Sequence, residues 1–330
     1  MHILAFETSC DDTSVAVLED DKLISLKTYS QLEAHNKTKG VVPEVAARLH
    51  AHNIFSVLDE VLAEAKMNLK QFDYIVCTKE PGLLPSLLVG LSVANTFGKL
   101  LGIPVVEINH IKAHIFANYL EREEKDLEFP ALCLTVSGGH NEIYLWKSMF
   151  DLELIGESLD DAAGEAFDKV AKMLDLEYPG GPIISRLSSE YTGEFRGIFP
   201  KVLLKNENIQ NFSFSGLKSA VKREIDSRLE KKGKLTLEDK KEIAFEFEKV
   251  TVDTLKTRLF EIAKKLNIKN LVLAGGVSAN NRLKDEIVKE GEKTGIKVLC
   301  PVSNVYSQDN AAMVGIYGYY LVKNKRLIVN

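Results

Sequence analysis

Cysteine and long apolar runs are both scarce in this sequence of 330 residues. The four cysteines stand singly, without the C-x-x-C spacing of a zinc or redox site and without the density of a disulfide-stapled domain. No run approaches the roughly 18 apolar residues that a membrane-spanning helix needs. The opening residues, MHILAFETSCDDTS, turn acidic too early for a signal peptide, so we interpret them as a strand and a turn. These absences predict a cytoplasmic protein with reduced thiols and no membrane association.

An excess of positive charge is missing as well, because the net charge is −5. An acidic chain lacks the general basic field with which many proteins hold nucleic acid. Seven basic residues do gather between Lys218 and Lys234, but Glu224, Asp226 and Glu230 alternate with them. We interpret this segment as a solvated helix face, with a local contact to RNA as the alternative.

Each half of the chain opens with two strands that a small polar turn joins. The strands span residues 2–7 and 14–19 around the turn 8–13, and residues 131–136 and 142–146 around the turn 137–141. Apolar residues at helical spacing follow over 43–66 and over 237–266. Strands that alternate with helices in this way predict an α/β fold with an internal duplication.

Length and composition predict two domains. Hydrophobic residues form 45% of the chain and charged residues 27%, which is enough apolar content for two buried cores. A charged connector near residues 121–130 separates the two halves, without a low-complexity linker. We expect one lobe over 1–125 plus 302–330, a second over 126–301 with a mostly helical insertion near 183–236, and a cleft between them.

Two histidines one helical turn apart form the first candidate site. His110 and His114 follow a predicted strand, and side chains at i and i+4 lie on one helix face about 6 Å apart, which suits chelation of one metal ion. The pair resembles the H-E-x-x-H of zinc proteases, but Ile111 stands where the general base would be. Spacing alone leaves open a metal site and two ordinary helix histidines. His50 and His52, only two positions apart, are interpreted as surface residues.

Three glycine-containing turns form the second candidate site. They contain Ser137, Gly138 and Gly139, then Gly180 and Gly181, and finally Gly275 and Gly276. Unobstructed backbone N–H groups can hold an anion at such turns, and the helix expected after Gly276 adds a favourable dipole. Together with the polar turn 8–13, they predict a nucleotide in the cleft between the lobes.

The acidic stretch 157–169 admits a structural and a functional role. Asp160 and Asp161 can cap the start of a helix. Glu165 and Asp168 lie deeper in that helix, where a carboxylate could accept hydrogen bonds from ribose or substrate hydroxyls. The stretch alone does not decide between these roles.

Nine short motifs span residues 7 to 313. They are E-T-S-C-D-D-T-S (7–14), G-V-V-P-E-V-A-A-R (40–48), N-H-I-K-A-H (109–114), V-S-G-G-H (136–140), D-D-A-A-G-E-A-F-D-K (160–169), Y-P-G-G-P (178–182), F-S-F-S-G-L-K (212–218), A-G-G-V-S-A-N (274–280) and D-N-A-A-M (309–313). In this order they resemble the tRNA N6-adenosine threonylcarbamoyltransferase family, the TsaD proteins, in its bacterial branch. The resemblance implies the two-lobed actin/Hsp70/sugar-kinase superfold, with duplicated ribonuclease H-like domains.

The resemblance also implies site residues. His110, His114 and Asp309 match the family's metal ligands for one divalent ion, Fe²⁺ in first place and Zn²⁺ as the second candidate. Positions that match the family's nucleotide-binding residues are Thr135, Val136, Ser137, Gly138, Gly139, Asp168, Gly181 and Asn280. ATP or the threonylcarbamoyl-adenylate is the expected nucleotide.

The reaction that the resemblance implies is acyl transfer. The threonylcarbamoyl group would pass from threonylcarbamoyl-AMP to the N6 amine of adenosine 37 in tRNAs that read codons beginning with A. The implied partners are the shorter paralogue TsaB and the P-loop ATPase TsaE, while an enzyme of the TsaC/Sua type supplies the adenylate. Asp11 is our candidate for accepting the amine proton.

Three positions depart from the family pattern. Glu80 stands where the family usually has glycine, Asn141 where it has threonine, and Ser307-Gln308 where it has Cys-Thr. Glu80 puts the geometry of the loop at Pro81 in doubt. None of the three removes a metal or nucleotide ligand.

Two other functions are alternatives for this sequence. An ATP-dependent kinase of the same superfold would carry Asp-x-Gly-x-Thr in the first turn and would leave the histidine pair unexplained, whereas this chain has Ser9 and Asp11 there. A non-catalytic scaffold resembling the shorter paralogue would not require the metal triad.

Overall fold

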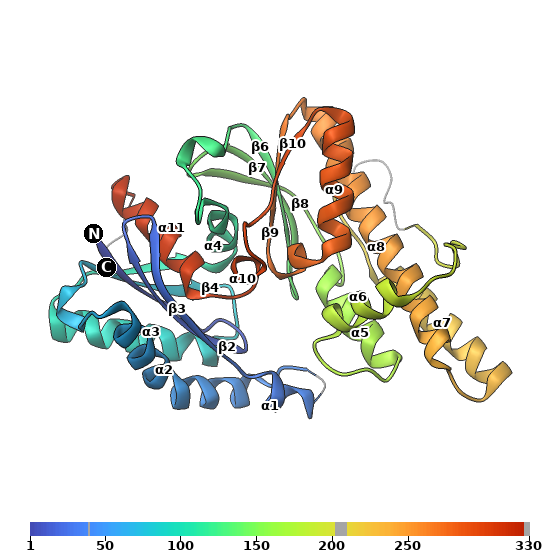
Figure 1. The fold of residues 1–330 in the computed structure, drawn as a ribbon, viewed down its shortest axis with the longest axis horizontal. Helices are drawn as coiled ribbons and strands as arrows, with labels where there is room; N and C mark the ends of the chain where they lie inside the picture. The colour runs from blue at the N-terminus through green and yellow to red at the C-terminus, as the bar shows by residue number, and fades with distance from the viewer. Residues whose placement is uncertain (39, 202–209, 327–330) are drawn as a thin grey trace. The chain divides into compact units, whose positions relative to one another are not determined.

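The computed structural model describes residues 1–38, 40–201 and 210–326, and the chain divides into two compact units. Unit 1 comprises Met1–Leu127 and Pro301–Asn330, and unit 2 comprises Glu128–Cys300. Each unit contains a five-stranded sheet with helices packed on it (Figure 1). The predicted α/β fold is therefore confirmed.

The sheet of unit 1 has the strand order β3-β2-β1-β4-β5. Its strands are β1 (His2–Glu7), β2 (Asp12–Glu19), β3 (Lys22–Ser30), β4 (Tyr74–Glu80) and β5 (Val105–Asn109). β1 is antiparallel to β2 and parallel to β4, and β4 is parallel to β5. The carboxyl ends of β1, β4 and β5 consequently meet at one edge of the sheet, where α/β proteins usually place their sites.

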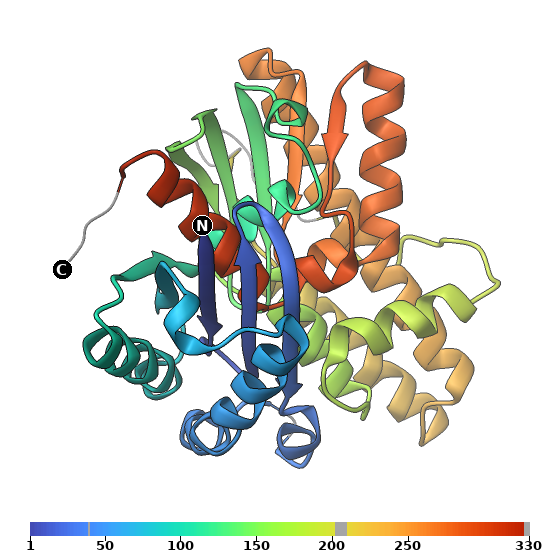
Figure 2. The same ribbon diagram turned by 60° about the vertical axis from the view of Figure 1, so that its left-hand side comes forward.

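Helices cover both faces of this sheet (Figures 1 and 2). α2 (Pro43–Ala65) and α3 (Leu84–Leu101) pack on the face that carries Leu4 and Phe6. α11 (Ala311–Lys323) packs on the opposite face, where a Cβ added at Gly315 would meet Leu18 and Ala5. The shorter helices of the unit are α1 (Leu32–Asn36), η1 (Leu69–Gln71), α4 (His110–Phe116), η2 (Ala117–Tyr119), η3 (Glu124–Asp126) and α10 (Asn304–Ser307).

The sheet of unit 2 repeats this topology with the order β10-β9-β6-β7-β8. Its strands are β6 (Ala131–Val136), β7 (Asn141–Ser148), β8 (Asp151–Glu157), β9 (Asn270–Ala274) and β10 (Lys297–Leu299). β6 is antiparallel to β7 and parallel to β9, as β1 is to β2 and β4. The duplication predicted from the two strand pairs is confirmed at the level of strand order and direction.

Among the described residues of unit 2, the helices are α5 (Ala163–Met173), α6 (Gly180–Glu190), α7 (Ser215–Lys232), α8 (Leu237–Leu266), η5 (Gly276–Ala279) and α9 (Asn281–Thr294). The bounds of α8 agree with the prediction because both of its ends carry strong signals. Thr236 and Asp239 form a capping box at the start, and Asn267 ends the helix in the left-handed conformation. Residues from α5 to α9 pack with β6 and β7 into one apolar core.

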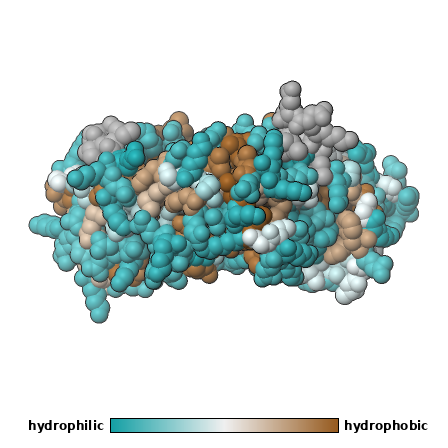
Figure 3. Space-filling view, turned by 90° about the horizontal axis from the view of Figure 1, so that it is seen from above, coloured by the Kyte–Doolittle hydropathy of each residue, from teal (hydrophilic) through white to brown (hydrophobic). Residues whose placement is uncertain are grey.

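One helix among the described residues, α3, is long and apolar enough to cross a membrane by length and composition. Polar residues such as Asn95 and Lys99 interrupt its apolar run, as the sequence indicated. Leu84, Leu88 and Leu100 of this helix are 52–75% exposed. Hydrophilic residues cover most of the surface seen in Figure 3.

Candidate functional site

The predicted metal ligands converge within unit 1. α4 begins at His110, directly after β5, and Asn109 caps it by accepting a hydrogen bond from the Lys112 N–H (3.0 Å). The rings of His110 and His114 are buried, with centroids 4.6 Å apart. Asp309 Oδ1 lies 3.0 Å from His114 Nε2 and 3.5 Å from His110 Nε2. Two imidazoles and one carboxylate, from segments far apart in the sequence, therefore face one another.

Asn310 holds Asp309 in this place. Its Nδ2 donates to the carbonyls of Val305 (3.1 Å) and Gln308 (2.7 Å), while its Oδ1 accepts from the Met313 N–H (3.0 Å) and so caps α11. The side-chain amide of Asn310 therefore fixes the backbone before and after Asp309. The departure at Ser307-Gln308 leaves this arrangement intact, since the backbone of Gln308 makes the contact.

Glu7 is a site residue that the sequence reasoning missed. This fully buried carboxylate at the end of β1 lies 3.0 Å from His110 Nδ1 through Oε2, which also accepts from Thr78 Oγ1 (2.6 Å). Its Oε1 accepts from the Ser9 N–H (2.6 Å). A carboxylate on one ring nitrogen fixes the tautomer and leaves Nε2 for a metal, as in many histidine metal sites. The available signal was the glutamate that opens the motif E-T-S-C-D-D-T-S.

The charges at this site influence one another strongly. Burial alone would raise the pKa of Asp309, but the neighbouring His110 and His114 lower it to about 2. Burial would lower the pKa of His110, but the carboxylates of Asp309 and Glu7 outweigh burial and raise it to about 9. Burial lowers the pKa of His114. In the absence of a cation, a proton on His110 compensates the buried negative charge.

These residues suit a divalent metal. The possible ligand atoms of His110, His114 and Asp309 all lie within 4.8 Å of one another. Two imidazoles and a carboxylate are the donor set of non-haem Fe(II) sites with open positions, and the same donors bind Zn²⁺. The second carboxylate, Glu7, supplies further negative charge beneath them. A dication would replace the proton that His110 otherwise needs.

Buried polar contacts with α2 hold the turn between β1 and β2 in place. His50, which we predicted to be a surface residue, is buried in α2. Its Nδ1 lies 2.8 Å from Thr13 Oγ1 and its Nε2 lies 2.9 Å from the Cys10 carbonyl oxygen. The prediction was wrong because spacing along one helix says nothing about the turn against which the helix packs. His52, by contrast, is exposed.

Two carboxylates in this turn have shifted pKa values. Burial is the largest cause of a raised pKa at Asp11. Burial, followed by the charges of Asp11 and Asp309, raises the pKa of Asp12 to about 7. We expected Asp11 to be the functional carboxylate of this turn; Asp12 is a second carboxylate there whose pKa is raised by burial.

The loop after β4 packs directly on the same turn. A Cβ at Gly82 would lie 2.7 Å from the Ser9 carbonyl oxygen, and the Leu83 N–H donates to that same oxygen (2.7 Å). Glycine is therefore required at position 82 by close backbone approach. Glu80 ends β4 with its side chain exposed, so the departure at this position does not enter the contact.

In unit 2, the turn that follows β6 is closed by its own backbone. The Ser137 N–H donates to the His140 carbonyl (2.8 Å), and the His140 N–H donates to Ser137 Oγ (3.1 Å). In the part of the chain that the structure describes, no heavy atom beyond the adjacent residues comes within 4 Å of a Cβ placed at Gly138 or Gly139, whereas Thr135 and Val136 are buried in β6. Asn141, the departure in β7, is buried, and neither polar atom of its side chain has a partner among the described residues.

The other two glycine turns are held by side chains. Asp168 Oδ1 accepts from the Gly180 N–H (2.7 Å) at the start of α6, and the space around a Cβ at Gly181 is open. Gly275 has φ +84°, and a Cβ there would lie 2.5 Å from the Val136 carbonyl oxygen. Asn280 caps α9 by accepting from the Leu283 N–H (2.9 Å). The turns at 137–139 and 275–276 therefore lie side by side in unit 2.

Asp160 and Asp161 do not take the capping role that the sequence left open, because the residue at the N-cap of α5 is Ala162, which makes no side-chain cap bond. Asp160 instead accepts from Ser213 Oγ and from the Phe214 N–H (2.7 Å). Asp161 pairs with Lys169 and Lys218. The motifs at 160–169 and 212–218 thus bind each other, a contact that no local rule could reveal.

Most of the basic segment 218–234 is engaged in ion pairs. Besides Lys218, these involve Lys222 with Asp226, Arg228 with Glu224, Asp239 and Glu242, and Lys232 with Asp239. Arg228 is buried among these acids. The structure accordingly supports a helix face and helix contacts for this segment, and leaves few free cations for RNA.

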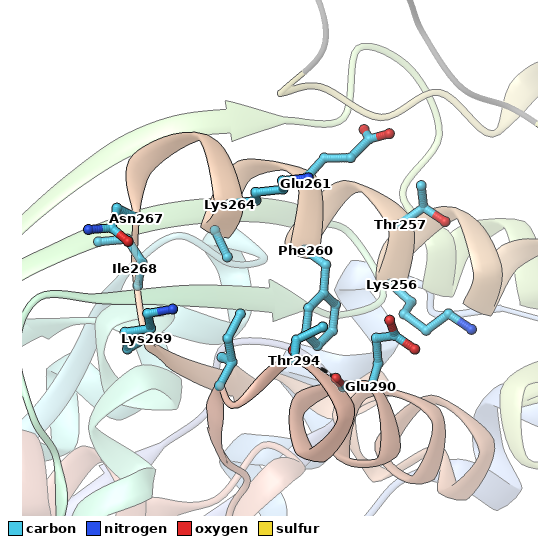
Figure 4. A pocket seen from close by; sticks show the side chains of 12 residues that line it. Lys256, Thr257, Phe260, Glu261, Lys264, Asn267, Ile268, Lys269, Glu290 and Thr294 are labelled. Atoms are coloured by element: carbon cyan, nitrogen blue, oxygen red, sulfur yellow. Dashed lines mark hydrogen bonds between the residues drawn. The ribbon is translucent and has the colours of Figure 1, made fainter.

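A groove of about 640 Å³ lies elsewhere in unit 2, beside α8 and the end of α9 (Figure 4). Phe260, Ala263 and Ile296 contribute apolar surface, and Lys264 and Lys269 lie along it. None of the predicted site residues lines this groove. The fold does not connect it with either candidate site.

Comparison with known proteins gives one consistent family. The model of the family "TsaD: tRNA N6-adenosine threonylcarbamoyltransferase" matches residues 22–316. A protein of that name from Persephonella marina is 44% identical over 333 residues, which cover 100% of this chain and 93% of the relative. Another from Thermosipho africanus is 44% identical over 323 residues, covering 98% and 95%.

Solved structures show the fold. HypF from T. kodakarensis aligns with a TM-score of 0.60 at 14% identity, over 98% of this chain and 48% of that chain. Component A of the Acidaminococcus fermentans (R)-2-hydroxyglutaryl-CoA dehydratase aligns with a TM-score of 0.54 at 14% identity, over 98% and 99%. The expected actin/Hsp70/sugar-kinase superfold is confirmed by this likeness and by the repeated sheet.

Proposed function

This chain belongs to the tRNA N6-adenosine threonylcarbamoyltransferase family, and from that premise we propose that His110, His114 and Asp309 hold one divalent metal that its reaction requires. The convergence of these three side chains around a shared space is the observation that carries the proposal. Fe²⁺ is the favoured ion, and Zn²⁺ is the second candidate. Bound there, the ion would supply Lewis acidity toward oxygens of the threonylcarbamoyl group.

The reaction forms threonylcarbamoyladenosine in tRNA. With threonylcarbamoyl-AMP as donor, the N6 amine of adenosine 37 attacks the carbamoyl carbon, the bond to the phosphate oxygen breaks, and AMP leaves. One proton must leave the attacking amine. Asp11 is proposed to accept it, and burial raises the pKa of this carboxyl toward the range useful for a base.

The nucleotide part of the donor is assigned to the glycine turns of unit 2. We propose that backbone N–H groups at Gly138, Gly139, Gly181, Gly275 and Gly276 hold its phosphate and ribose, while Ser137 closes the first of these turns through its bonds with His140. Open space around several of these glycines supports the proposal. Thr135, Val136, Asp168 and Asn280 are assigned supporting positions around the nucleotide. ATP would bind at the same turns, and the predicted cleft between the lobes stays a prediction.

A partner surface is proposed on α2 and α3. Phe55 of α2 and Leu84, Leu88 and Leu100 of α3 are large apolar side chains that are each more than half exposed, and the two helices contact each other. The shorter paralogue TsaB is the proposed occupant. We further propose that TsaE is a second partner and that an enzyme of the TsaC/Sua type supplies the adenylate. The proposed location is the cytoplasm.

The test of the metal proposal is a reconstituted reaction. Purified chain, both partners, ATP, threonylcarbamoyl-AMP and unmodified tRNA are combined, and nucleosides are analysed by mass spectrometry. We expect threonylcarbamoyladenosine with the wild type and at least a hundredfold less with His110→Ala. Full product with His110→Ala would overturn the metal proposal while leaving the family assignment in place. Phosphoryl transfer to a small molecule would instead indicate the kinase alternative.

A further inference from the structure

A buried carboxylate of α8 joins two glycine-bearing segments of unit 2. Glu248 is 2% exposed, and its Oε1 accepts hydrogen bonds from Ser185 Oγ (2.6 Å) and Asn280 Nδ2 (2.7 Å). Its Oε2 lies 3.1 Å from Arg282 Nε. Asn280 Nδ2 also donates to Ser185 Oγ (2.8 Å). One carboxylate thus binds residues of α6, of α9 and of the turn that precedes α9.

Each of these contacts fixes a backbone segment that carries a proposed nucleotide contact. Ser185 belongs to α6, whose first residues are Gly180 and Gly181. Asn280 ends the turn that begins at Gly275. The side chain of Asn280 donates to Glu248 and Ser185 and accepts from the backbone, so its hydrogen-bonding groups are engaged by the protein itself. The turn can therefore reach a nucleotide mainly through its backbone N–H groups.

We infer that Glu248 is a positioning residue for the nucleotide part of the donor, acting by holding the glycine turn 275–280 against α6, the helix that begins with Gly180 and Gly181. The inference rests on the proposed function of these turns. A turn that is held in place before the ligand arrives binds it with less loss of conformational freedom. Loss of the carboxylate should therefore weaken nucleotide binding more than it slows the chemical step.

A glutamine at position 248 would test this role with almost no change in volume. Ser185 and Asn280 donate hydrogen bonds to Glu248, and the Arg282 guanidinium, which can only donate, forms an ion pair with it. One end of a glutamine amide would therefore place N–H groups against a donor. Arg282 also lies over the ring of Phe245, 4.8 Å from its centroid. This stacking restrains the guanidinium from moving away from the mismatch.

Glu246 provides a matched control in the same helix. It is fully buried and accepts from the backbone N–H groups of Arg196 (2.5 Å) and Ile198 (3.1 Å). Neither of those residues belongs to a glycine turn of the proposed site. Glu246→Gln makes the same chemical change at similar burial, so it reports the cost of disturbing α8 alone.

The experiment measures AMP binding to the full chain by calorimetry, together with steady-state kinetics for threonylcarbamoyl-AMP. For Glu248→Gln we expect the dissociation constant of AMP and the KM for the adenylate to rise roughly tenfold, with kcat within about threefold of wild type. Glu246→Gln should bind AMP within about twofold of wild type. The inference would be overturned if Glu248→Gln bound AMP as tightly as the wild type. It would also be overturned if both variants lost AMP affinity to the same extent.

Two further variants separate the possible failures. Gly276→Val adds a side chain where no described atom beyond the adjacent residues lies within 4 Å of the Cβ, so it should fold and still weaken AMP binding. If Gly276→Val binds AMP like the wild type, the nucleotide site is refuted and the inference with it. If only Gly276→Val weakens binding, the inference alone fails. Should Glu248→Gln not fold, Ser185→Ala removes one donor of the network, and wild-type AMP affinity in that variant would contradict the role of Glu248.

Discussion

The side chains around His110 determine which nitrogen of its ring carries a proton and how strongly the ring holds it. Glu7 lies 3.0 Å from Nδ1, so it determines which ring nitrogen is free to bind a metal. Asp309 and Glu7 together raise the pKa of His110 to about 9. The charges of Glu7 and of the three metal ligands therefore influence one another. A change at Glu7 should alter the affinity of the site for a metal.

We predict that Glu7→Gln weakens metal binding by roughly 10- to 100-fold, since a neutral amide fixes the His110 tautomer less firmly and removes a negative charge. Competition with a chelator of known affinity measures this. Glu107→Gln is the matched control, because Glu107 lies in β5 of the same sheet and pairs with Lys79. Comparable metal affinity in the wild type and Glu7→Gln would show that Glu7 has no such role.

The metal-free protein should lose stability as pH rises. The pKa of His110 is raised to about 9 in the folded state, so its contribution is complete below the unfolded value near 6.5 and is lost as pH rises through about 9. Asp309, with a pKa of about 2, stays ionised throughout this window. We expect the free energy of unfolding to fall by on the order of 3 kcal/mol between pH 6.5 and 9.

Urea unfolding in the presence of a chelator checks this expectation at several pH values. His110→Gln should show a markedly flatter dependence on pH, because the titrating group is gone. Wild type loaded with metal should also be flatter, since a coordinated imidazole does not take up a proton. The same slope in metal-free wild type and His110→Gln would contradict the assignment.

At the scale of elements, α11 matters because it both carries the segment of Asp309 and packs directly on the sheet of unit 1. A Cβ at Gly318 would lie 2.5 Å from Val76 Cγ2. We predict that Gly318→Ala lowers the free energy of unfolding by about 1–3 kcal/mol through overpacking. Denaturant unfolding measures it.

Gly216 in α7 is the control for this substitution, because nothing lies within 4 Å of a Cβ there. Gly216→Ala should raise the free energy of unfolding by about 0.4–1 kcal/mol, as alanine favours the helix. A stabilised Gly318→Ala protein would mean that α11 does not lie as close to β4 as described.

The elements show what could be predicted from the sequence. The helix over 237–266 and the opening strand pair of each unit were predicted from the spacing of apolar residues, a signal that acts over a few positions. The burial of His50, the role of Glu7 and the partners of Asp160 depend on segments 37 to 103 positions away. Patterns among neighbouring residues do not predict contacts between segments so far apart in the sequence. The metal triad was predicted only because ordered family motifs linked the histidines to Asp309.

At the scale of the whole molecule, we assign the exposed apolar side chains of α2 and α3 to a partner protein. Leu88 of α3 is 52% exposed. We predict that Leu88→Asp weakens binding to the shorter paralogue more than tenfold while leaving the unfolding midpoint unchanged, because an exposed position tolerates a charge and an interface does not. Light scattering on mixtures of the two proteins measures the complex.

Leu229→Asp is the control for the interface, since Leu229 in α7 of unit 2 is 38% exposed and lies in the other unit. This variant should bind the paralogue like the wild type. Equal weakening by both substitutions would indicate a general loss of solubility, and no weakening by Leu88→Asp would place the partner elsewhere.

The account as a whole depends on a metal held by His110, His114 and Asp309, and metal content measured beside product formation tests it most directly. Wild type and Asp309→Ala are loaded anaerobically with Fe²⁺, desalted and assayed for bound iron and for threonylcarbamoyladenosine with partners, adenylate and tRNA. We predict about one iron per wild-type chain with product in proportion to iron, and neither iron nor product in Asp309→Ala. Wild-type amounts of product from iron-free Asp309→Ala would contradict the account.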